Sequence, residues 1–137
     1  MKNEILIAAA FKARENSYSP YSNYRVGAAV LTSTGKIYTG SNVENASYGG
    51  TICAERSAAV KAVNDGEQCF VAVAVAGAVS GAETGDYSYP CGICRQFLRE
   101  FAAPNMRILV AKTRDDILDV TLEQLLPYSF GPDNLTS

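Results

Sequence analysis

Apolar residues in the first third of the chain recur first at a helical spacing and then at spacings typical of strands. Residues 3–17 carry apolar side chains at the spacing of one helix face. Residues 26–32 and 36–42 are rich in strand-forming residues and flank a turn that contains Gly35. The pattern therefore predicts a helix followed by a β-hairpin.

The rest of the chain alternates between helix and strand patterns. A polar loop at 45–51 precedes a predicted helix that Thr51 would cap and that would stop at Asp65-Gly66. The elements predicted after it are a buried strand at 70–77, a long loop at 78–90, a helix at 91–103 before Pro104, strands at 107–112 and 117–120, and a short helix at 122–126 before Pro127.

This order of elements predicts an α/β fold. Helices alternate with strands in the middle of the chain, which favours a mixed five-stranded sheet within a three-layer α/β/α sandwich. Only residues 113–116 separate the last two strands, too few for a crossover, so these strands are expected to be antiparallel.

Composition narrows the class of protein. A chain of 137 residues is expected to form one domain, residues 1–137, and 47% hydrophobic with 19% charged residues is typical of a globular protein. The net charge of −2 comes with no basic stripe, so neither nucleic acid nor a membrane surface is an expected partner. No apolar run has transmembrane length and the first residues do not resemble a signal peptide, so we expect a cytoplasmic protein with reduced cysteines.

Three cysteines and one glutamate form the most informative pattern. Cys53 precedes Glu55 by two residues, Cys91 and Cys94 follow Pro90, and the chain contains no histidine. Each cysteine group lies at the predicted start of a helix, where the helix dipole favours the thiolate that zinc binds. Three ligands leave one tetrahedral position open for water, as in catalytic zinc sites, and Glu55 is close enough to carry its proton.

Two other interpretations remain open from these residues. The Cys91-Gly92-Ile93-Cys94 motif by itself is also typical of a thioredoxin-like redox pair. A structural zinc site would need Cys69 as a fourth ligand, but Cys69 adjoins the apolar strand and is expected to be a small buried hydrophobic residue. A third cysteine that precedes a glutamate favours catalytic zinc over both.

Taken together, these motifs resemble the small, homotetrameric, zinc-dependent cytidine deaminases. The similarity extends over nearly the whole chain, in segments 18–28, 42–48, 53–58, 90–96, 125–127 and 130–132. It implies a cytidine-deaminase-like fold, one Zn²⁺ per chain on Cys53, Cys91 and Cys94, and Glu55 as the catalytic residue.

The resemblance also implies substrate-binding residues. Asn42 and Glu44 would hold the ribose hydroxyls, Ala54 would contact the substrate, and Tyr24 would stack on the pyrimidine where the family usually has phenylalanine. Ala46, Tyr48 and Phe130 would complete the site of a neighbouring subunit in a homotetramer.

The expected reaction is the hydrolytic deamination of cytidine and 2′-deoxycytidine to uridine and 2′-deoxyuridine, with release of ammonia, in pyrimidine salvage. The alternatives are a deaminase of another cytosine nucleoside, such as a nucleoside antibiotic, and a non-catalytic zinc-binding module. Three thiolates donate much negative charge to a metal, so Arg56 is expected to offset it by hydrogen bonding to thiolate sulfur. Arg95 is a weaker candidate for that role, and is expected to be a solvated helix residue or a subunit contact.

Overall fold

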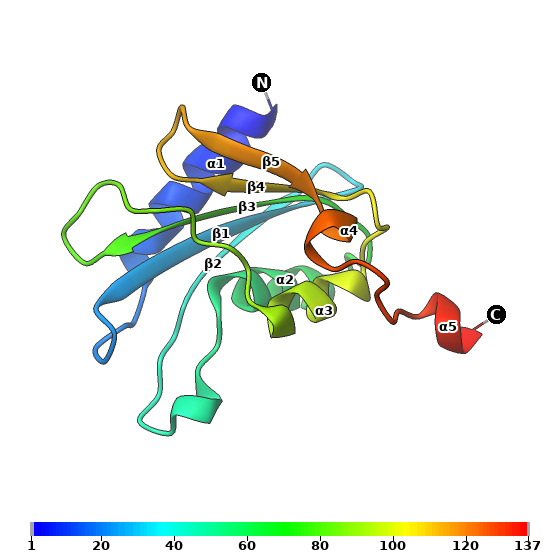
Figure 1. The fold of residues 1–137 in the computed structure, drawn as a ribbon, viewed down its shortest axis with the longest axis horizontal. Helices are drawn as coiled ribbons and strands as arrows, with labels where there is room; N and C mark the ends of the chain where they lie inside the picture. Colours follow the sequence, from blue (N-terminus) through cyan, green and yellow to red (C-terminus); the bar gives the residue numbers. More distant parts are fainter. Residues whose placement is uncertain (1, 137) are drawn as a thin grey trace.

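The computed structural model describes residues 2–136, and its centre is a five-stranded mixed sheet with the strand order β2-β1-β3-β4-β5 (Figure 1). The strands are β1 (Tyr24–Thr32), β2 (Ile37–Ser41), β3 (Phe70–Val79), β4 (Arg107–Ala111) and β5 (Ile117–Thr121). The hairpin predicted for the first two strands is confirmed, because β1 and β2 pair antiparallel. The antiparallel pairing predicted for the last two strands, β4 and β5, is confirmed as well, whereas β3 and β4 are parallel.

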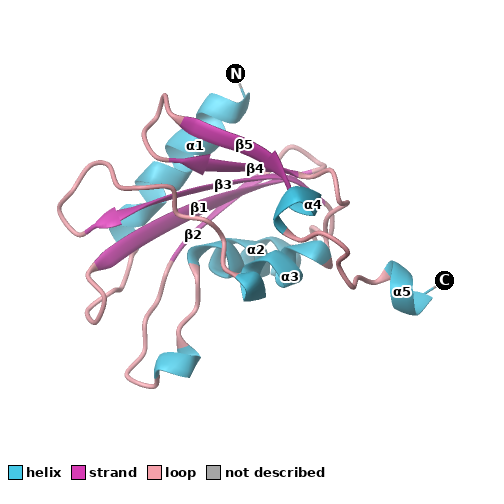
Figure 2. Cartoon of the chain, in the orientation of Figure 1, coloured by secondary structure: helices cyan, strands magenta, loops and turns pink. Residues whose placement is uncertain are grey.

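Helices cover both faces of this sheet, which confirms the predicted three-layer α/β/α arrangement (Figure 2). One face carries α1 (Lys2–Ala13), and the other carries α2 (Ala54–Asn64), α3 (Gly92–Arg99) and α4 (Leu122–Leu125). A short α5 (Asp133–Thr136), which the sequence pattern did not predict, lies near the C-terminus. Within residues 2–136, no helix combines the length and apolar character that crossing a membrane requires.

The two faces of the central strand β3 differ in side-chain size, and this difference sets how closely each helix layer packs. Val73 and Val75 point into the core under α2 and α3, whereas alanines at 72, 74 and 76 face α1. Small side chains permit a close approach of α1, and so does Gly27 of β1, whose hypothetical Cβ would lie 2.1 Å from the carbonyl oxygen of Ala10. Any side chain at Gly27 would therefore displace α1 from the sheet.

Three details of the predicted pattern are wrong. The cap of α2 is Cys53 rather than Thr51, because residue 52 is still extended and pairs with Val43 in a β-bridge. The helix predicted at 91–103 ends at Arg99, well before Pro104. Cys69 is exposed rather than buried, since it lies just before β3 rather than within the strand.

Candidate functional site

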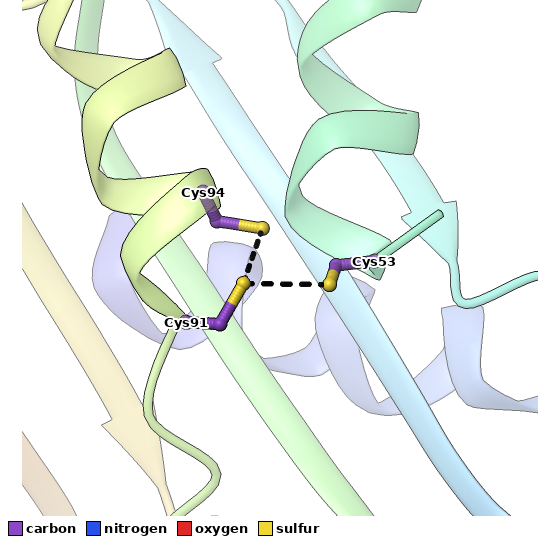
Figure 3. Close-up of side chains that lie close together, drawn as sticks. All are labelled: Cys53, Cys91 and Cys94. Carbon is purple, nitrogen blue, oxygen red and sulfur yellow. Dashed lines mark hydrogen bonds between the residues drawn. The ribbon is translucent and has the colours of Figure 1, made fainter. Parts of the chain in front are cut away.

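The start of α2 and the start of α3 lie side by side and bring three cysteines together (Figure 3). Cys53 is the N-cap residue of α2, Cys91 is the N-cap residue of α3, and Cys94 lies in the first turn of α3. The Sγ atom of Cys91 is 3.6 Å from that of Cys53 and 3.6 Å from that of Cys94. All three Sγ atoms lie within 4.8 Å of one another, so thiols separated by 38 residues in sequence share one small volume.

The spacing of the thiols fits zinc. Two sulfurs bound about 2.3 Å from a tetrahedral ion are about 3.8 Å apart, close to the separations seen here. A redox pair needs only Cys91 and Cys94, whereas a third thiol, that of Cys53, lies 3.6 Å from Cys91 Sγ, and this third thiol favours a metal site over a redox pair. Cys69 is not part of the cluster, which removes the fourth ligand of a structural site.

The surroundings favour a thiolate at Cys53 and a protonated thiol at Cys94, whose pKa is raised by its hydrogen bond to Cys53 and by burial. A hydrogen bond from Cys94 lowers the pKa of the Cys53 thiol to about 5, and Arg56 acts in the same direction. The Arg56 Nη2 donates to Cys53 Sγ at 3.8 Å and to the carbonyl oxygen of Thr51 at 3.3 Å. Burial opposes the charge of this guanidinium, but its hydrogen bonds to Cys53 and Cys94 outweigh that cost and raise the Arg56 pKa.

Arg95 has a different place from Arg56. Its Nε donates to the Pro90 carbonyl oxygen at 2.7 Å, and its Nη1 donates to the Leu125 carbonyl oxygen at 2.8 Å. Arg95 is therefore not a merely solvated residue, because the side chain ties the start of α3 to the end of α4, and its expected role as a subunit contact stays a prediction. Arg95 holds the segment that presents Cys91 rather than contacting the sulfurs by any hydrogen bond within the described residues.

Glu55 is a buried carboxyl group beside the thiols. It lies in the first turn of α2, is only 3% exposed, and lines the same cavity as Cys53 and Cys91. Burial raises the pKa of the Glu55 carboxyl to about 7, and the neighbouring Cys53 adds to the shift. A carboxyl group with such a pKa can both hold and release a proton near neutral pH.

The cavity has a volume of about 260 Å³, just below the range of small-molecule sites, which span roughly 300–1,000 Å³. Besides Glu55, Cys53 and Cys91, its lining includes three substrate-binding residues expected from the sequence, namely Tyr24, Asn42 and Ala54. The Asn42 side chain accepts from the backbone N–H of Val26 at 3.0 Å and donates to the Tyr24 carbonyl oxygen at 2.9 Å.

Ser88 and Tyr89 also line this cavity, and the sequence pattern did not single them out. The Tyr24 hydroxyl finds its partner here, 2.6 Å from Ser88 Oγ. Gly77 leaves room for this pair, because a Cβ there would lie 2.4 Å from Ser88 Oγ and 2.9 Å from the Tyr24 ring. The only sequence signal for Ser88 and Tyr89 was their position in the long loop before Cys91.

Four of the expected substrate-binding residues lie outside this cavity. Glu44 lines an adjacent cavity of about 250 Å³ with Tyr48, and Thr51 lines both cavities. The Glu44 carboxylate accepts hydrogen bonds from the backbone N–H groups of Tyr21 and Ser22 and from the Ser22 hydroxyl, which lowers its pKa. Ala46 lies in the same extended loop, whereas Phe130 is exposed in the C-terminal segment, where its carbonyl oxygen accepts from Gln96.

An α/β/α sheet with three convergent thiols at two helix starts and a buried carboxyl group defines a zinc-binding hydrolase-like protein. Residues 1–110 match the family model described as the cytidine and deoxycytidylate deaminase zinc-binding region. This chain therefore belongs to the cytidine deaminase family of zinc-dependent hydrolases.

Relatives and solved structures agree with this assignment. The chain is 44% identical to a cytidine deaminase of Sporosarcina psychrophila over 99% of this chain and 96% of that protein, and 40% identical to one of Halalkalibacterium halodurans over 98% of each. A crystal structure of cytidine deaminase from Burkholderia pseudomallei superposes with a TM-score of 0.86 at 42% identity, covering 95% of this chain and all of that chain. The predicted zinc-dependent cytidine deaminase family and fold are thus confirmed.

Proposed function

We propose that this protein hydrolyses the exocyclic amine of cytidine and 2′-deoxycytidine, which yields uridine or 2′-deoxyuridine and ammonia. The observation that carries the proposal is the buried Glu55 in the same cavity as Cys53 and Cys91. The cavity holds an acid–base group and a metal-binding cluster side by side, as hydrolysis requires.

In the proposed mechanism, Cys53, Cys91 and Cys94 hold the zinc ion. The ion supplies Lewis acidity that makes a water molecule reactive toward C4 of the cytosine ring. Glu55 takes one proton from the water molecule and gives it to N3 of the ring. It then takes the remaining proton of the oxygen that has added to C4 and gives it to the C4 amine, which leaves as ammonia while the C4 carbonyl forms. Tyr24 offers its ring as a stacking surface and Ala54 contacts the base, while Asn42 binds a sugar hydroxyl.

Arg56 has a supporting role in this proposal. Its guanidinium donates to Cys53 Sγ and cannot lose its charge at physiological pH. It therefore withdraws negative charge from the three-thiolate cluster together with the N-termini of α2 and α3.

Two alternatives make different predictions in one assay. A non-catalytic zinc module would carry one zinc per chain without consuming cytidine, and a deaminase of another cytosine nucleoside would act on that compound in preference to cytidine. Zinc content by elemental analysis, combined with ultraviolet measurement of cytidine loss against a panel of cytosine nucleosides, separates these outcomes.

We expect cytidine to be processed at least about tenfold better, in kcat/KM, than cytidine monophosphate, because the Glu44 carboxylate repels a phosphate at the sugar end. The lowered pKa of Glu44 keeps it charged across the assay range. Thr51 lines both the cavity of Glu55 and the cavity of Glu44. A sugar attached to a base in the Glu55 cavity would therefore extend into the Glu44 cavity.

The matched variant Glu44→Gln should reduce this discrimination. The control variant Glu67→Gln, at a half-buried residue between α2 and β3 that lines neither cavity, should leave it unchanged. Comparable kcat/KM for the two substrates in the unmodified protein would show that Glu44 does not face the sugar.

We also propose a homotetramer in which Ala46, Tyr48 and Phe130 of one subunit complete the site of another. The small volume of the Glu55 cavity favours a site that residues of another subunit complete. Tyr48 and Phe130 are suited to this role because they are large aromatic residues that are 72% and 57% exposed.

If this sharing is correct, Phe130→Ala should raise KM for cytidine severalfold while zinc content stays at one per chain. Leu135→Ala is the control, because Leu135 is also exposed in the C-terminal segment but has no assigned role. Steady-state kinetics and sedimentation test the proposal together, and a fully active monomer at assay concentration would contradict it.

The wider setting of the protein follows from this chemistry. We propose that residues 1–137 form a single deaminase domain, although residues 1 and 137 lie outside the described residues. Three thiolates must stay reduced to hold zinc, which supports a cytoplasmic location. Conversion of free cytosine nucleosides to uracil nucleosides fits a role in pyrimidine salvage, with small nucleosides rather than nucleic acids as substrates.

A further inference from the structure

A third, larger cavity lies on the α1 face of the sheet, away from the thiols. Its volume is about 590 Å³, and its walls come from the C-terminal half of α1, the paired ends of β1 and β3, the loop after β3 and the β4–β5 link. Four of its side chains are cationic, namely Lys12, Arg14, Arg25 and Arg114, whereas two are acidic, namely Glu15 and Glu83. The cavity therefore has a positive excess in a chain whose net charge is −2.

Two of the arginines are held around one aromatic ring. The guanidinium carbon of Arg14 lies 4.6 Å from the centre of the Phe11 ring, and that of Arg114 lies 5.1 Å from the same centre. The Phe11 side chain is only 6% exposed, so its ring is a fixed platform for both cations. Arg14 Nε also donates to the Phe11 carbonyl oxygen at 3.4 Å, which fixes the direction of the guanidinium.

These positive charges are close enough to repel one another. Burial lowers the pKa of Arg14, and the neighbouring Arg114 and Arg25 lower it further, whereas Tyr24 and Glu83 act in the opposite direction without reversing the shift. Within residues 2–136, the ion pairs of the structure involve Lys36, Arg99 and Arg107, and none includes a cation of this cavity. Guanidinium groups kept together without a close carboxylate partner are the usual arrangement for binding phosphate groups.

We propose that this cavity binds a small anion that carries two or more linked phosphate groups, such as a nucleoside diphosphate or triphosphate. Four cations from three separate segments can surround several phosphate oxygens at once, which a single phosphate group would not require. Ala8, Val79 and Ala82 add apolar wall, and the volume lies within the range of small-molecule sites. The shared chemistry is the polyphosphate group, whether it is free or attached to a nucleoside.

The proposed site is separate from the catalytic cavity but shares two segments with it. Arg25 and Tyr24 are neighbours on β1, and since strand side chains alternate, one lines each cavity on opposite faces of the sheet. The loop between β3 and α3 contributes Glu83 to this cavity and Ser88 to the other. Substrate and polyphosphate can therefore be bound at the same time.

The test is calorimetric titration of the zinc-loaded protein with inorganic phosphate, pyrophosphate, tripolyphosphate and ATP, all without added divalent metal. We expect tripolyphosphate to bind at least tenfold tighter than inorganic phosphate, with an affinity that falls as salt is added. Arg114→Gln should weaken tripolyphosphate binding about tenfold, the worth of one charge-assisted hydrogen bond. If ATP binds more tightly than tripolyphosphate, the nucleoside contacts the apolar wall of the cavity. If the two affinities are equal, the site recognises the polyphosphate group alone.

Two further variants make the result specific to this cavity. Arg107→Gln changes the net charge by the same amount as Arg114→Gln but removes a cation that is paired with Asp119, so binding should not change. Glu83→Gln removes a negative charge from the wall and should tighten binding severalfold.

Several outcomes would overturn the proposal. If Arg107→Gln weakens binding as much as Arg114→Gln does, the binding reflects net charge alone. If Arg114→Gln has no effect on binding, or if saturating cytidine displaces the polyphosphate, the anion binds in the zinc cavity. No measurable heat with tripolyphosphate would also overturn it. Because cytidine turnover of Arg114→Gln and Glu83→Gln is measured separately and should remain normal, this test can fail while the proposed deaminase activity stands.

Discussion

Glu55→Gln is expected to keep its fold and its zinc but to lose about two to four orders of magnitude in kcat, which is the usual contribution of a positioned acid–base group. Glutamine has nearly the same shape as glutamate, so the buried position should tolerate it. It cannot give or take the protons that the reaction moves, and the chain has no histidine to replace it. The pKa of about 7 that burial produces at Glu55 suits a group that must do both.

The measurement combines initial rates of cytidine loss with elemental analysis for zinc. Glu123→Gln is the control, since Glu123 is an exposed residue of α4 outside the cavity. Near-normal turnover by a zinc-loaded Glu55→Gln protein would exclude Glu55 as the proton carrier and leave the mechanism without an acid–base group.

Cys91→Ser is expected to abolish deamination and to lower zinc affinity by more than about a hundredfold, beyond the 10–100-fold typical of losing a group that only supports a ligand. Cys91 is the middle of the three thiols, because its sulfur lies 3.6 Å from each of the other two. A hydroxyl group does not ionise as a thiol does, so the ion would keep only two anionic ligands.

Cys69→Ser provides the matched control for this experiment. Cys69 is exposed and lies outside the thiol cluster, so its replacement should leave zinc content and rate unchanged. Competition with a chromogenic zinc chelator measures the zinc affinity of each of the two variants. Equal loss of zinc in the two variants would restore the four-cysteine structural site, and full zinc retention by Cys91→Ser would exclude Cys91 as a ligand.

Much of the fold could be predicted from the sequence because helix and strand patterns are local. The apolar run of β3 and the short link between β4 and β5 correctly predicted a buried strand and an antiparallel pair. Element ends were less accurate. Thr51 has the chemistry of an N-cap, but pairing of residue 52 with Val43 keeps the chain extended as far as Cys53. A contact between distant segments outweighed a local preference there.

The sequence by itself also determined the chemistry of the site, since three cysteines, one nearby glutamate and no histidine leave few alternatives. Only the tertiary structure decided which cysteines meet. It excluded Cys69, joined the Tyr24 hydroxyl to Ser88, and put Glu44 in a neighbouring cavity rather than beside Glu55.

The cationic cavity shows the same limit most clearly. Lys12 and Arg14 are close in sequence, but Arg25 and Arg114 come from distant segments, so no basic stripe is visible along the chain. Spacing along a chain determines which side chains share one face of one element. Which elements meet depends on the order of strands in the sheet and on how closely each helix packs against it, and only the folded chain sets these.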